Sequence, residues 1–142
     1  MNTEELIQPG RFYLAGLGSV RKAFLTALGP EVEAWFRQSR ETIERGYREE
    51  NWFLTPTHIV RSVATPNEIE FEVVTRSSIL AIHQRYEVIS ESETPYAVLR
   101  RVNLLLSEGR NLDIPVPDTD YLDEYGKAYR EFVSKLVVVE AP

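Results

Sequence analysis

The first half of the chain is predicted to be helical, because its apolar residues recur at a spacing of three or four. Ser19 suits the cap of a short helix and Gly29 its end, while Pro30 suits the first turn of a second helix. The pattern therefore predicts helices over residues 19–48 and leaves residues 1–18 without a clear assignment. The apolar stripe of the second helix would consist of Val32, Trp35, Phe36, Ile43 and Tyr47.

From residue 57 onward the apolar period changes from helical to alternating. Glutamates alternate with apolar residues over 68–73, which is typical of a strand with one buried face. A second alternating run covers residues 79–89, and a further strand is predicted over residues 96–107. The last of these is apolar on both faces, as in a central strand or one that meets a helix or another subunit. The inward residues of the first run would be Ile69, Phe71 and Val73.

Matching the inward faces of the two alternating runs predicts a hairpin in which Val73 pairs with Ile82. The turn would lie at residues 77–78. The outer face of this hairpin then places Glu72 beside His83, and this charge complementarity supports the chosen register.

A third amphipathic helix is predicted over residues 118–136, because acidic residues begin it and basic residues follow. The whole chain, residues 1–142, is thus interpreted as a single α+β domain. Its expected architecture is an antiparallel meander of about four strands over residues 57–107, packed against amphipathic helices. Helices are expected at both ends of the chain.

The charge of the chain argues against a nucleic-acid partner. Its 16 Lys and Arg are outnumbered by 22 Asp and Glu, which gives a net charge of −6. No basic run exceeds Arg100–Arg101, whereas a phosphate backbone attracts concentrated positive charge. Residues 12–20 form an apolar stretch that is too short to span a bilayer, and the N-terminus is acidic where a secretory signal is basic. We therefore expect a cytoplasmic protein with no membrane partner.

The chain has no cysteine and only two histidines, so no sulfur-ligated or histidine-rich metal site is expected. No dinucleotide or phosphate-binding loop is present either, and no cofactor is expected. The best polar group on the predicted hairpin is His83 with Arg85 and Glu72. A histidine beside a carboxylate can serve as an acid or base, which makes these three residues weak catalytic candidates. The alternative interpretation is a solvated sheet face whose ion pairs contribute little.

Two groups of residues are candidates for a protein interface. Tyrosines at four-residue spacing on the C-terminal helix suit either intramolecular packing or a half-exposed contact surface. The β-branched run that follows this helix suits strand addition to the chain's own sheet or to a neighbour's. The tyrosines are Tyr121, Tyr125 and Tyr129, and the β-branched residues are Val137, Val138 and Val139.

Two classes of function are compatible with this sequence. The first is a non-catalytic protein–protein interaction or structural module, a subunit of a homo-oligomer or larger assembly whose partner is itself or an assembly neighbour. The absence of catalytic motifs, the two-faced strand and the candidate interface residues favour it. The alternative is a small-ligand-binding or enzymatic cone, in which a curved sheet wraps a helix, similar to cystatin-like and nuclear-transport-factor-like shapes.

Overall fold

The structure is a computed structural model of the 142-residue chain, and it describes residues 1–43, 46–117 and 123–137. The chain divides into two compact units. The first contains residues 1–76 and 117–142, and the second contains residues 77–116. Each unit is described by itself below.

The first unit is built on a four-stranded antiparallel sheet with the order β1-β2-β3-β4. Short polar turns join β2 to β3 and β3 to β4: the Thr55 N–H donates to the His58 carbonyl and the Thr65 N–H donates to the Glu68 carbonyl, both at 2.9 Å. Because each strand pairs with the next one in sequence, β1 and β4 are the two edges of this sheet. The strands are β1 (Ala34–Ile43), β2 (Gly46–Leu54), β3 (His58–Ala64) and β4 (Ile69–Thr75).

One face of this sheet is covered by two N-terminal helices, α1 (Thr3–Leu6) and α2 (Gly18–Leu28). The Asn2 side chain caps α1 by accepting the Glu4 N–H at 2.8 Å, and α2 ends at Gly29, whose positive φ of 72° suits glycine. Their apolar side chains join the inward residues of β2 and β3 in one core. This core contains Leu6, Ile7, Phe12, Ala15, Phe24, Leu28, Val32, Phe53 and Val60.

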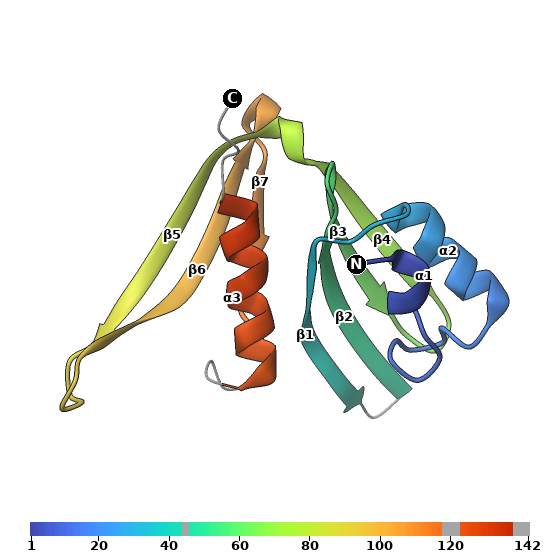
Figure 1. Cartoon of the computed structure of the whole chain (residues 1–142), viewed down its shortest axis with the longest axis horizontal. Helices are drawn as coiled ribbons and strands as arrows, with labels where there is room; N and C mark the ends of the chain where they lie inside the picture. Colours follow the sequence, from blue (N-terminus) through green and yellow to red (C-terminus); the bar gives the residue numbers. More distant parts are fainter. Residues whose placement is uncertain (44–45, 118–122, 138–142) are drawn as a thin grey trace. The chain divides into compact units, whose positions relative to one another are not determined.

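The other face of the sheet is covered by α3 (Glu124–Val137), which packs mainly on β1. The buried ring of Phe36 connects the two elements, with ring centroids 5.2 Å from Tyr129 and 5.0 Å from Phe132. Figure 1 shows α1 and α2 on one side of the sheet and α3 on the other. Successive residues of a strand point to opposite faces, so Trp35 lies on the α1/α2 side and Phe36 on the α3 side.

The second unit is a three-stranded antiparallel sheet with the order β5-β6-β7. A short 3-10 helix at Arg76–Ser78 precedes β5, and another at Ser107–Gly109 joins β6 to β7. Positive φ angles at Glu108 and Gly109 make this second connection tight. The strands are β5 (Ile79–Ile89), β6 (Tyr96–Leu106) and β7 (Asn111–Ile114).

The α+β class with antiparallel strands is confirmed, but the predicted helix over residues 30–48 is wrong. This segment contains β1 and the first three residues of β2, and the two strands pair so that Trp35 lies opposite Phe53 and Thr42 opposite Tyr47. Because helices cover both faces of the sheet, apolar residues occur on both sides of β1 and the alternation of a half-buried strand is lost. The third helix, expected over 118–136, is observed over Glu124–Val137, and residues 118–122 lie outside the described residues.

The predicted hairpin between the two alternating runs is also wrong. Val73 pairs with Val60 of β3, and Ile82 pairs with Leu104 of β6, so the two runs belong to different sheets. Val73 was expected in the core, yet 48% of its surface is exposed, whereas the neighbouring Val74 is buried. A period-two pattern gives the face of each residue but not the identity of the neighbouring strand. The expectation of a single domain over residues 1–142 stays a prediction.

Candidate functional site

The outer edge of β1 lies in a groove. In the part of the chain that the structure describes, β1 pairs with β2 alone, so its other edge carries no sheet partner. A cavity of about 450 Å³ follows this edge over residues 33–37. Its size is within the range of sites that hold small molecules or short peptide segments. We call this cavity the β1 groove.

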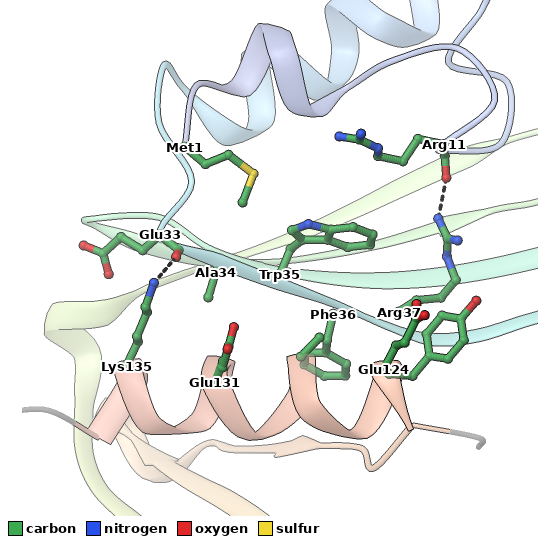
Figure 2. A pocket seen from close by; sticks show the side chains of 12 residues that line it. Met1, Arg11, Glu33, Ala34, Trp35, Phe36, Arg37, Glu124, Glu131 and Lys135 are labelled. Atoms are coloured by element: carbon green, nitrogen blue, oxygen red, sulfur yellow. Dashed lines mark hydrogen bonds between the residues drawn. The ribbon is translucent and has the colours of Figure 1, made fainter. Parts of the chain in front are cut away.

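The β1 groove has two walls (Figure 2). One wall, called the N-terminal wall, lies on the face of β1 that residues 1–28 cover. It contains Met1, Arg11 and the ring of Trp35. The opposite wall is one face of α3, since its lining residues recur at three- and four-residue spacing. The α3 residues that line the groove are Glu124, Tyr125, Ala128, Glu131 and Lys135.

An extended segment already pairs with the chain just before β1. The Val32 N–H donates to the Met1 carbonyl at 2.9 Å, and the Thr3 N–H donates to the Pro30 carbonyl at 3.1 Å. The next N–H, that of Glu33, points the other way and donates to the Leu54 carbonyl of β2 at 2.7 Å. Because N–H groups alternate along an extended chain, those of Ala34 and Phe36 face the open edge.

A buried ion pair supports the N-terminal wall. The Glu49 side chain is 0% exposed and the Arg37 side chain 7% exposed, and the Arg37 Nη2 lies 3.4 Å from the Glu49 Oε1. The Arg37 guanidinium also donates to the Asn51 side chain at 3.1 Å and to the Arg11 carbonyl. The Tyr13 N–H donates to the Glu49 Oε2 at 2.9 Å. The pair therefore ties the loop around residues 11–13 to the sheet.

The Glu49 carboxylate also contacts two side chains nearer the connection between β1 and β2, those of Arg40 and Tyr47. The Arg40 Nε lies 3.2 Å from the Glu49 Oε1, and the Tyr47 hydroxyl donates to that oxygen at 3.2 Å. Burial raises the pKa of the Tyr47 hydroxyl, although its hydrogen bond with Arg40 opposes that change. Tyr47 therefore remains a protonated donor at neutral pH. The hydrogen bonds of Glu49 are satisfied by the protein itself, as a buried charge requires.

A second buried glutamate, Glu50, lies on the opposite face of β2. Its Oε1 accepts from Arg61 at 2.9 Å and from Arg48 at 3.0 Å, and its Oε2 accepts from the Trp52 indole at 2.9 Å. Burial raises the pKa of the Glu50 carboxyl, but these three hydrogen bonds and the charge of Arg61 outweigh burial and lower it overall. The carboxylate form is therefore the one that stabilises the fold.

Replacing Glu50 with glutamine is expected to lower the free energy of unfolding by about 1–3 kcal/mol at neutral pH, because charged hydrogen bonds are lost. A lowered pKa in the folded state stabilises the protein above the ordinary value of 4.5, and this stabilisation disappears as the pH falls through the folded-state pKa. The difference in free energy of unfolding between Glu50→Gln and the unaltered protein should therefore decrease toward zero as the pH falls below 4.5. Urea unfolding across a pH series measures it, with Glu70→Gln at an exposed position as the control. A difference that is constant with pH would contradict this assignment.

The structure does not bring the weak catalytic candidates together as the hairpin required. His83 pairs with Asn103 and Arg85 with Arg101 in the second unit, whereas Glu72 pairs with Arg61 in the first. The predicted pairing of Glu72 with His83 is therefore wrong, for the same reason as the hairpin.

The candidate interface residues fall in different environments. Tyr125 is 38% exposed and lines the β1 groove, whereas Tyr129 is buried against Phe36 in the core. Val137 is half-buried at the last position of α3. Tyr121, Val138 and Val139 lie outside the described residues.

The sequence interpretation missed Arg37, Glu49 and Glu50 because it placed Arg37 on the solvent-exposed face of a helix and left residues 49 and 50 between the predicted helices and the predicted sheet. A signal was available in residues 47–54, where two adjacent glutamates are followed, after Asn51, by the aromatic pair Trp52 and Phe53. If this segment is treated as a strand, Glu49 and Glu50 point to opposite faces, and each must find a cation.

Comparisons with known proteins assign no family to the chain. No protein-family model matches it, and no curated protein or solved structure matches it. In residues 1–43, 46–117 and 123–137, no three side chains of His, Asp or Glu are grouped as metal ligands. Among the helices described, none has the length and apolar character needed to cross a membrane.

Proposed function

We propose that this protein is a non-catalytic interaction module that binds an extended segment of a partner protein in the β1 groove. The observation that supports the proposal is the open edge of β1, which lies at the back of a cavity of about 450 Å³ between two walls. An added strand would hydrogen-bond to the N–H groups of Ala34 and Phe36 and place its side chains alternately against the two walls.

The segment at Met1–Thr3 supports this mode of binding. It runs antiparallel to residues 30–32 along the same edge, and a partner strand would continue its line past Glu33. The two walls of the groove are also fixed by hydrogen bonds within the protein. Arg37 fixes the N-terminal wall through the Arg11 carbonyl, and Lys135 fixes α3 by donating to the Glu33 carbonyl at 2.8 Å. A preformed site loses less entropy when a ligand binds.

Short synthetic peptides of alternating valine and threonine test the proposal, because they favour extended backbone without carrying charge. Peptide binding should change the fluorescence of Trp35 in the groove, and the change should disappear in Trp35→Phe. Two further peptides carry N-methyl groups on alternate amides, so that only one of them blocks the edge that faces β1. We expect that peptide alone to lose about tenfold or more in affinity.

Two results would contradict the proposal. Equal binding of both methylated peptides would show that no strand is added. If neither the valine–threonine peptide nor its valine–lysine and valine–glutamate counterparts bind, the groove does not hold extended chains. Light scattering on the protein alone tests whether a second copy of this chain occupies the groove. If the protein is a dimer that the peptide dissociates, the segment bound in the groove belongs to a second copy and not to a different protein.

A further inference from the structure

We infer that the segment held in the β1 groove is basic, and this inference rests on the proposed strand addition. Its lysine or arginine side chains face α3, and its apolar side chains face Trp35. The negative charge on the α3 wall supports this inference, because the charged groups elsewhere in the groove have partners within the protein.

The α3 wall presents two carboxylates to the groove, those of Glu124 and Glu131 (Figure 2). Both side chains are exposed, and neither forms an ion pair within the described residues. They lie seven residues apart on the helix, which places them about 10 Å apart along its axis at 1.5 Å per residue. Side chains on one face of a strand repeat about every 7 Å, so two long basic side chains of one strand can reach both carboxylates.

The cations that line the groove are already engaged. The Lys135 Nζ donates to the Glu33 carbonyl, the Arg11 Nη1 donates to the Leu6 carbonyl at 3.2 Å, and Arg37 is buried with Glu49. The carboxylate of Glu33 is engaged as well, since it lies 2.9 Å from the Arg76 guanidinium. A hydrogen bond to a carbonyl leaves the positive charges of Lys135 and Arg11 in place, but both groups are directed at acceptors within the protein. The charged groove side chains without a hydrogen-bond or ion-pair partner in the described residues are therefore those of Glu124 and Glu131.

The wall opposite α3 is aromatic and favours apolar side chains. Trp35 is half-buried against Phe12 at 4.9 Å between ring centroids, and it offers an aromatic surface to the groove. Side chains of an added strand alternate between the two walls, so basic positions facing α3 would alternate with apolar positions facing Trp35. The net charge of −6 on the whole chain favours the approach of such a segment at low salt.

A panel of three peptides tests the inference: alternating valine with lysine, with threonine and with glutamate. We expect the lysine peptide to bind about tenfold more tightly than the threonine peptide at low salt, and the glutamate peptide to bind most weakly. In Glu131→Gln combined with Glu124→Gln, the affinity for the lysine peptide should fall to that for the threonine peptide. Glu68→Gln, an exposed position outside the groove, serves as the matched control and should leave the ranking unchanged.

The panel separates this inference from the proposed function. Equal affinity for all three peptides, or tightest binding of the glutamate peptide, would overturn the basic partner and leave strand addition standing. Binding of none of the three would overturn both. The threonine peptide also reports on the fold of the double variant, because its affinity should not depend on the two carboxylates. If its affinity falls together with that of the lysine peptide, the carboxylates do not act through charge and the inference is overturned.

Discussion

Replacing Glu49 with alanine is expected to lower the free energy of unfolding by about 3–5 kcal/mol, because the substitution leaves the buried Arg37 guanidinium without its counterion. The change also removes the acceptor of the Tyr13 N–H and of the Asn51 side chain. Each buried donor left without a partner adds its own desolvation penalty. Urea unfolding monitored by circular dichroism measures the loss.

The control for this prediction is Glu41→Ala. Glu41 is an exposed glutamate of β1, opposite Arg48, and its loss should change stability by about 0.5 kcal/mol or less. Arg37→Met combined with Glu49→Leu removes both charges, and it should destabilise the protein less than Glu49→Ala alone. A Glu49→Ala protein as stable as the Glu41→Ala control would show that Glu49 is not a buried partner of Arg37.

Replacing Phe36 with alanine is expected to cost about 3–5 kcal/mol, the range for a large aromatic side chain lost from a core. Its ring lies at the centre of the α3 contact, stacked on Trp52 at 6.3 Å between ring centroids and edge-on to Tyr129 and Phe132. A cavity at this position removes the main attachment of α3 to the sheet. We therefore expect protease cleavage within α3 to become faster, in addition to a lower midpoint of urea unfolding.

Tyr96→Ala is the matched control for Phe36→Ala, since it removes an exposed aromatic ring from β6 in the second unit. Its effect on stability should be small, and cleavage within α3 should not change. If Phe36→Ala leaves both stability and α3 cleavage at the level of this control, α3 is not held to β1 by the Phe36 contacts.

The α+β class was predictable because residues 19–28 have helical spacing and residues 68–73 alternate. The change of apolar period placed near residue 57 does not mark the start of the sheet, because β1 and β2 precede it. α3 was visible for a similar reason: its buried residues Tyr129, Phe132, Val133 and Leu136 recur at helical spacing on an otherwise polar segment. β1 and β2 were not visible, because a strand covered on both faces has no alternation to detect. In such a segment the aromatic and β-branched residues are the better guide.

The β1 groove could not be predicted from one sequence. Its walls come from residues near 1–11, 33–37 and 124–135, which come together only after the sheet has formed and α3 has packed on it. Tyr125 was singled out from the sequence and does line the groove, but the spacing that identified it served equally well for the buried Tyr129. The pairing of strands was the missing information, because face alternation is compatible with several neighbours.

The measurement that tests the proposed strand addition most directly is amide hydrogen exchange by NMR, with the valine–lysine peptide added to the isotope-labelled protein. The N–H groups of Ala34 and Phe36 should exchange more slowly in the complex, because they would donate to the peptide backbone, and nuclear Overhauser contacts should connect the peptide to β1. The amides of β5, the edge strand that carries the exposed side chains of Leu80 and Val88, should be unaffected. Protection along β5 with no change at Ala34 and Phe36 would contradict the β1 groove as the binding site.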